Sequence, residues 1–174
     1  MGRALSDARG VKGSNMETQD DLKFIKRTIE LAKKNLTTND GGPFGALITK
    51  NGEIIAEGWN TVTSSNDPTS HAEVNAIRKA CKTLNSFQLD DCTLYTSCEP
   101  CPMCLGAIYW ARPSRIVFAA SREDAAFGGF DDEWLYQEIA APTKKRKIET
   151  VQITDPEAHK LFQLWKEKVD KTPY

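Results

Sequence analysis

The order of apolar and polar positions along the chain predicts helices that alternate with strands. Apolar residues recur every three or four positions from Asp20 to Leu36, which is the periodicity of an amphipathic helix. Asn51-Gly52 is a strong hairpin sequence and separates two predicted strands, over residues 44–49 and 53–62. The pattern further predicts helices over 71–84, 102–110, 132–139 and 156–169, and strands over 92–96, 115–120 and 148–153.

This succession of elements indicates the fold class. Strands that alternate with helices after an opening hairpin are typical of an α/β protein, here a three-layer α/β/α sandwich with a central mixed sheet. A length of 174 residues fits one domain, which we expect to span residues 17–174. Residues 1–16 are rich in Gly, Ser, Arg and Lys without periodicity, so we expect a disordered tail or a cloning remnant.

Composition and charge narrow the possible partners. The chain is 40% hydrophobic and 27% charged, with a formal net charge of −1, whereas a generic nucleic-acid binder carries a basic excess. No apolar run approaches the roughly 18–20 residues that a membrane helix needs. The N-terminus has no apolar core of the signal-peptide type. We therefore expect a cytoplasmic protein that binds neither a membrane nor nucleic acid.

The cysteines supply the first chemical indication. Three of the five, Cys98, Cys101 and Cys104, lie in one short segment, which in a chain without a secretion signal indicates metal or redox chemistry. Cys81 and Cys92 are predicted to be ordinary buried thiols. Cys101 and Cys104 are three positions apart at the start of a predicted helix, so their sulfurs face the same side. A helix N-terminus also favours the thiolate form that binds metals.

A second motif, His71-Ala72-Glu73, begins the helix predicted over 71–84. One imidazole and two thiolates give zinc three ligands and leave a position for water, as in catalytic zinc sites. Glu73 is close enough to exchange protons with that water without being a ligand. The alternatives are a structural zinc site that includes Cys98, a redox pair of cysteines, and a binding module whose zinc only holds the fold. Glu73 favours catalysis, because a structural site has no use for its carboxylate.

Taken together, the two motifs resemble a known signature. His-x-Glu followed by Pro-Cys-x-x-Cys is typical of the zinc-dependent nucleoside and nucleobase deaminases. From about Asp20 to Tyr174 the chain further resembles the bacterial guanine deaminases. The stretches that carry this closer resemblance are Gly41-Gly42-Pro43-Phe44-Gly45, Asn66-Asp67-Pro68, His71-Ala72-Glu73-Val74, residues 97–112, Gly129-Phe130-Asp131-Asp132 and the terminal Tyr174.

The resemblance implies a cytidine-deaminase-like fold, one Zn²⁺ per chain held by His71, Cys101 and Cys104, and hydrolysis of guanine to xanthine and ammonia with Glu73 as the catalytic residue. It also implies substrate contacts from Phe44, Asn60, Ala72, Asp132 and Tyr174. Phe44 would form a wall of the pocket, Asn60 would hydrogen-bond the purine edge, and Asp132 would face the N1–H and amino group of guanine. From the residues alone, Phe44 can equally be core, Asn60 a turn residue and Asp132 a helix cap.

The resemblance further implies a homodimer that binds a small purine base. Its C-terminal arm, about residues 143–174, would be exchanged between subunits, so that Tyr174 closes the partner's pocket. Chain ends, however, are usually frayed. The basic run Lys144-Lys145-Arg146-Lys147 keeps a tRNA adenosine deaminase open as an alternative, although such a run is usually a solvated surface. Deamination of guanosine or cytosine remains a further alternative within the family.

Overall fold

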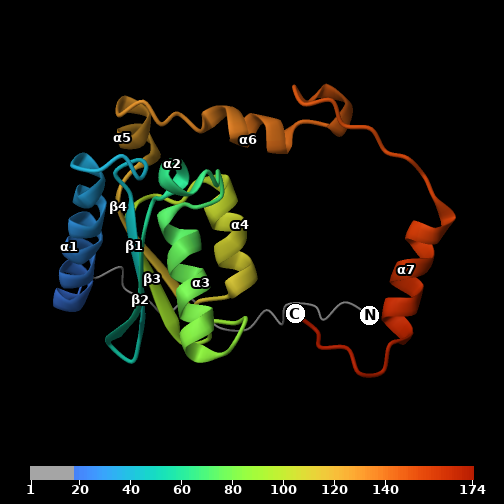
Figure 1. The fold of residues 1–174 in the computed structure, drawn as a ribbon, viewed down its shortest axis with the longest axis horizontal. Coiled ribbons are helices and arrows are strands. Elements are labelled where there is room, and N and C mark those ends of the chain that lie inside the picture. Colours follow the sequence, from blue (N-terminus) through green and yellow to red (C-terminus); the bar gives the residue numbers. More distant parts are fainter. Residues whose placement is uncertain (1–17) are drawn as a thin grey trace.

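The computed structural model describes residues 18–174, which form a mixed four-stranded sheet with helices on both faces (Figure 1). The strand order is β2-β1-β3-β4. Strand β1 (Gly45–Lys50) pairs antiparallel with β2 (Glu53–Trp59) and with β3 (Cys92–Cys98), and β3 pairs parallel with β4 (Arg115–Ala120). The predicted α/β sandwich is confirmed, while the tail predicted over 1–16 lies outside the described residues.

Two helical layers cover the sheet. Helix α1 (Gln19–Lys33) packs on one face, and α3 (Ala72–Leu84) and α4 (Pro102–Ala111) pack on the other (Figure 1). The alternation along β1 explains this division, because successive side chains point to opposite faces. Ala46 and Ile48 join the core beneath α3 and α4, whereas Leu47 packs with Phe24 and Tyr95 beneath α1. The core on each side is therefore specified by the two-residue period of the strand.

Glycines in the strands allow the helices to approach closely. A Cβ on Gly45 would lie 2.2 Å from the carbonyl oxygen of Thr28 in α1. A Cβ on Gly58 would lie 2.3 Å from the carbonyl oxygen of Ala72, the first residue of α3. The start of α3, where the His-x-Glu motif lies, is thus held directly against the sheet.

The turn between β1 and β2 has the predicted form. Asn51 and Gly52 adopt φ values of 53° and 79°, both in the left-handed region. Two successive positive φ values characterise the tight hairpin turn whose twist matches that of the strands, and Asn-Gly is its preferred sequence. The hairpin prediction is confirmed.

The second half of the chain departs from prediction in two places. The short helix α5 (Arg122–Phe127) was not predicted, although Ser121 and Asp124 form a capping box at its start. The strand predicted over 148–153 is wrong, because these residues belong to no strand and Ile148, Val151 and Ile153 are exposed. Apolar residues in a short segment do not make a strand when no neighbouring strand offers backbone partners.

The remaining helices are short or peripheral. They are α2 (Val62–Ser65), α6 (Glu133–Ala140) and α7 (Pro156–Glu167), with 3-10 turns at Lys34–Leu36 and Thr143–Lys145. Helix α7 lies apart from the sheet at the end of an extended segment, and none of its residues is buried (Figure 1). Among the residues from 18 onward, no helix is long and apolar enough to cross a membrane.

Candidate metal and substrate site

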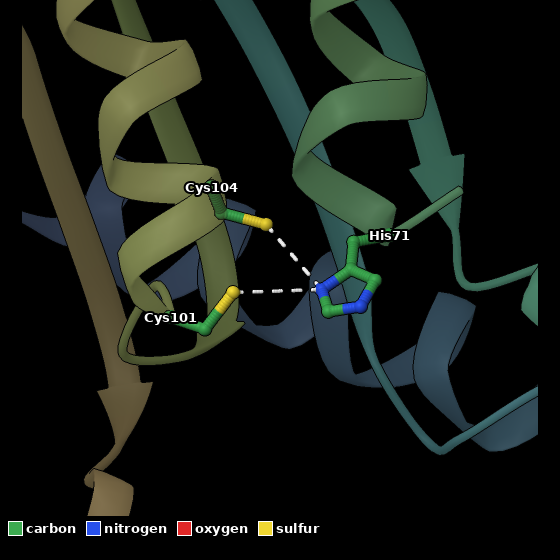
Figure 2. A group of neighbouring side chains, drawn as sticks. All are labelled: His71, Cys101 and Cys104. Atoms are coloured by element: carbon green, nitrogen blue, oxygen red, sulfur yellow. Dashed lines mark hydrogen bonds between the residues drawn. The ribbon is translucent and has the colours of Figure 1, made fainter. Parts of the chain in front are cut away.

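The N-termini of α3 and α4 bring three metal-binding side chains together (Figure 2). His71 is the N-cap of α3 and Cys101 is the N-cap of α4, with Pro102 at the next position and Cys104 one turn into the helix. The Nδ1 atom of His71 lies 3.6 Å from Sγ of Cys101 and 3.5 Å from Sγ of Cys104. All three ligand atoms lie within 4.8 Å of one another.

These distances fit a tetrahedral zinc ion. With Zn–S bonds of about 2.3 Å and Zn–N bonds of about 2.0–2.1 Å, a tetrahedral angle separates nitrogen from sulfur by roughly 3.6 Å. The two Nδ1–Sγ distances agree with this value. Cys98 is not part of the group, because its thiol donates to the carbonyl oxygen of Ser121 at 3.5 Å. Three ligands with a position left for water are typical of a catalytic zinc site and not of a closed structural one.

The electrostatics of the group also suit a cation. Hydrogen bonds from Cys104 and His71 lower the pKa of Cys101 to about 4. The same hydrogen bond to the Cys101 thiolate raises the pKa of Cys104, and the contact with Cys101 raises the pKa of His71. The positive ends of two helices favour negative charge at this place. A thiolate at Cys101 is therefore favoured where the geometry fits zinc.

Glu73 lies beside these ligands on the first turn of α3 and is almost fully buried. The Sγ of Cys104 donates to its Oε2 at 3.5 Å. Burial raises the pKa of Glu73 above its ordinary value, because the charged form loses its hydration. A carboxyl group with a raised pKa holds a proton more readily than an exposed one, and beside the metal ligands it is placed for proton transfer.

A cavity of about 340 Å³ is next to this group. It is lined by Phe44, Asn60, Val62, His71, Glu73, Cys98, Glu99, Cys101, Arg122, Ala125, Phe130, Asp131, Asp132, Trp134 and Leu135. Three of the five predicted substrate residues, Phe44, Asn60 and Asp132, are therefore on its wall. Ala72 is fully buried and does not line it, and Tyr174 lies elsewhere, against Trp110.

The carboxylate of Asp132 has no hydrogen bond to the helix that it precedes. Asp132 is the N-cap of α6, but its side chain accepts no capping hydrogen bond. The main-chain N–H of Glu133 instead donates to Oδ1 of Asp131 at 3.0 Å. Partial burial, together with the nearby charge of Cys101, raises the pKa of Asp132. Both residues line the cavity, but their hydrogen bonds differ: the carboxylate of Asp131 holds the start of α6, whereas that of Asp132 makes no capping bond and is available to a ligand.

Sequence reasoning missed Arg122, which connects the elements around the cavity. Its guanidinium lies 5.1 Å from the ring centre of Tyr136 and 3.7 Å from Glu133, both on α6. Its main-chain N–H donates to Oε2 of Glu99, between Cys98 and Cys101, at 3.3 Å. The capping box from Ser121 would have placed Arg122 in a first helical turn, but its contacts with α6 depend on the tertiary structure.

The fold and the site define a zinc-dependent deaminase. In agreement, residues 18–120 match the family described as "Cytidine and deoxycytidylate deaminase zinc-binding region", and the chain belongs to this family. The chain is 58% identical over 151 residues to the guanine deaminase of Bacillus subtilis (strain 168), which covers 87% of this chain and 97% of that protein.

Two solved structures and a further relative are also similar to this chain. The X-ray structure of guanine deaminase from Bacillus subtilis superposes with a TM-score of 0.86 at 57% identity, covering 88% of this chain and 98% of that one. A structure of guanine deaminase from Nitrosomonas europaea has a TM-score of 0.61 at 32% identity, over 68% and 67% of the two chains. The tRNA-specific adenosine deaminase of Bacillus subtilis is 42% identical, but over only 59% of this chain and 63% of that protein. The resemblance to guanine deaminases is confirmed.

Proposed function

We propose that this chain hydrolyses guanine to xanthine and ammonia, as a step in purine breakdown. The observation that carries the proposal is the free carboxylate of Asp132 in the same cavity as Glu73 and the zinc-binding group. Guanine presents an N1–H and an amino group side by side, and a carboxylate accepts from both. The identity to the Bacillus subtilis guanine deaminase, which extends over almost the whole of that protein, supports the same substrate.

His71, Cys101 and Cys104 hold the metal, and Glu73 moves the protons. Zinc, when bound, lowers the pKa of water to about 7 and so supplies hydroxide at neutral pH. Glu73 takes the proton that the water loses and delivers it to the ring nitrogen beside C2. Once the oxygen has added to C2, Glu73 takes the remaining proton of the added hydroxyl group and passes it to the amino nitrogen. The bond between C2 and that nitrogen then breaks, ammonia leaves, and C2–O becomes the carbonyl of xanthine. The raised pKa of Glu73 suits both directions of transfer.

The hydrogen-bond donors of the base meet an acceptor of the protein, and an acceptor of the base meets a donor. Asp132 accepts hydrogen bonds from the N1–H and amino edge, while Asn60 donates to an acceptor of the purine, which carries O6 and N7. Phe44 packs edge-to-face on Phe130, with ring centroids 4.9 Å apart, and the pair forms an apolar wall for the ring. A site that pairs the substrate's N–H groups rejects analogues that lack them by up to about 10⁴-fold.

Ammonia release distinguishes this function from its alternatives. The zinc-loaded protein is assayed with guanine, guanosine, adenine, cytosine, cytidine and a tRNA anticodon stem. Guanine is the expected substrate. Preferential release from the tRNA adenosine would instead assign the chain to the tRNA deaminases, and zinc binding without ammonia release from any of the six would favour a binding module.

We further propose a homodimer in which the arm of residues 143–174 crosses to the partner and Tyr174 closes the partner's cavity. The support is the composition of the arm: α7 exposes Leu161, Phe162, Leu164 and Trp165 and has no buried residue. A helix with an apolar face is stable when that face is covered.

The single deaminase domain is proposed to comprise residues 17–174. The five free thiols fit a reducing compartment, which supports a cytoplasmic location.

A further inference from the structure

Gly41, shortly before β1, has no room for a side chain, and this lack of space does not come from an unusual backbone conformation. A Cβ at this position would lie 2.0 Å from Oδ1 of Asn60, 2.9 Å from its Cγ and 3.0 Å from its carbonyl oxygen. Gly41 does not adopt a positive φ, so its conformation is open to any residue. Glycine is therefore required at position 41 for space, and the group that occupies this space is the Asn60 amide.

The Asn60 amide is held in one orientation. Its Oδ1 accepts a hydrogen bond from the main-chain N–H of Val62 at 3.1 Å. Rotation of the amide by half a turn would place its NH₂ group against this N–H, with two donors facing each other. The Nδ2 atom makes no hydrogen bond within residues 18–174. Since no buried side-chain nitrogen or oxygen in this range lacks a partner, Nδ2 is open to the cavity that Asn60 lines.

The backbone around Asn60 has little freedom to yield. The buried side chain of Asn35 donates both of its N–H groups, one to the carbonyl oxygen of Gly42 and one to that of Asn60, each at 2.7 Å. The main-chain N–H of Asn60 also donates to the carbonyl oxygen of Phe44 at 3.1 Å. These bonds fix the segment of Gly41 and Gly42 relative to Asn60. A side chain at position 41 must therefore displace the amide of Asn60 and not the backbone.

We propose that Gly41 is a positioning residue for substrate binding: by leaving room for the Asn60 amide it keeps Nδ2 directed at the base as a hydrogen-bond donor. The proposal rests on the proposed function only in that Asn60 contacts the base. A methyl group at position 41 turns the amide away from both Val62 and the cavity. The base then loses one hydrogen bond, which corresponds to about tenfold in binding.

A double-mutant cycle tests whether Gly41 acts through Asn60. Gly41→Ala is expected to raise KM for guanine about tenfold, the loss of one hydrogen bond, while kcat changes less and zinc stays at about one per chain. In the Asn60→Ala background the same change is expected to cost less than about twofold, because the displaced group is gone. Gly106→Ala is the matched control, since its Cβ would meet nothing within 4 Å.

Two results overturn the proposal: wild-type kinetics for Gly41→Ala, or an equal cost of Gly41→Ala in both backgrounds. If Gly41→Ala yields no folded protein, the double variant decides. Recovery of folded, zinc-loaded protein on removal of Asn60 supports the assignment of the conflict to its amide, and lack of recovery rejects it. If the wild type deaminates another base, the proposed substrate fails, and the same cycle on that base still tests Gly41.

Discussion

Tyr174 lies against Trp110 of its own chain, with ring centroids 5.9 Å apart and an interplanar angle of 45°. Trp110 is near the C-terminal end of α4, away from the N-terminus that carries Cys101. Tyr174 remains 70% exposed and Trp110 65% exposed, so this contact buries little of either ring. Within one chain the terminal tyrosine is thus placed outside the cavity and held weakly, and its proposed role depends on a second subunit.

Mixing two inactive variants tests the exchanged arm. One chain carries Glu73→Gln with an intact arm, and the other keeps Glu73 but ends before Lys171. Each alone is expected to be nearly inactive. After subunit exchange, the truncated chain's intact centre receives the partner's Tyr174, and guanine turnover returns to a fraction of the wild-type value.

Mass spectrometry of differently labelled chains serves as the control that exchange has taken place. With exchange demonstrated, a mixture that stays inactive means that the arm folds back on its own chain. A truncated protein that is fully active alone removes any role for Tyr174 in the site.

Glu73→Gln separates proton transfer from metal binding. The amide has nearly the same shape as the carboxylate but does not take a proton, so kcat is expected to fall by about 10²–10⁴-fold or more. Zinc content, measured by atomic absorption, is expected to stay near one per chain, because Glu73 is not among the three grouped ligands. Cys104→Ala is the contrasting variant and is expected to lose zinc. Near-normal turnover of Glu73→Gln would remove Glu73 from its assigned role.

The neighbours Asp131 and Asp132 form a matched pair for substrate recognition. Asp132→Ala is expected to lower kcat/KM for guanine by about 10²-fold or more, because the N–H edge of the base loses its acceptor. Its free energy of unfolding is expected to change little, since Asp132 makes no capping bond. Asp131→Ala is expected to reverse the pattern, with a loss of about 1 kcal/mol in stability and a smaller effect on turnover. Equal effects of the two variants on turnover would contradict the assignment.

The ion pair of Asp21 and Arg115 is expected to make the free energy of unfolding depend on pH. Two hydrogen bonds, of 2.6 and 2.9 Å, join them, and Tyr95 donates a third to Asp21 at 2.7 Å. The bonds from Arg115, followed by that from Tyr95, hold the pKa of Asp21 well below its usual range. A lowered folded-state pKa means that the stabilisation is complete above the unfolded pKa of about 3.9 and is lost as the pH falls towards the folded value.

Denaturant unfolding of the wild type and Asp21→Asn measures this effect. At pH 7 the wild type is expected to be more stable by about 1–2 kcal/mol, a value reduced by the exposure of the Arg115 side chain. The difference between the two proteins is expected to shrink below about pH 4, because Asp21 takes up a proton in the unfolded chain while it stays ionised in the folded protein. A difference that stays constant down to pH 2 would show that the carboxylate charge contributes nothing.

Local patterns in the sequence were sufficient for most of the elements and for the group of candidate metal ligands. The hairpin at Asn51-Gly52 follows from turn geometry, and helices α1, α3 and α4 follow from apolar periodicity. His71, Cys101 and Cys104 could be grouped as candidate metal ligands, with Glu73 expected beside them, because each lies at a helix N-terminus, whose geometry depends on residues nearby in sequence. The packing of α3 against α4 on one face of the sheet then brings the two helix starts together.

Only the tertiary structure decided which side chains share the cavity and in what orientation. Asp131 and Asp132 are indistinguishable as helix caps in the sequence, and it is the observed hydrogen bond to Glu133 that separates them. The segment over 148–153 was predicted as a strand but pairs with no other strand. Pairing is a contact between distant parts of a chain, so the segment's own residues do not determine it. The demand for glycine at position 41 likewise arises from Asn60, which is close in space but belongs to another loop. Periodicity and capping depend on neighbours in the chain, whereas pairing and packing depend on neighbours in space.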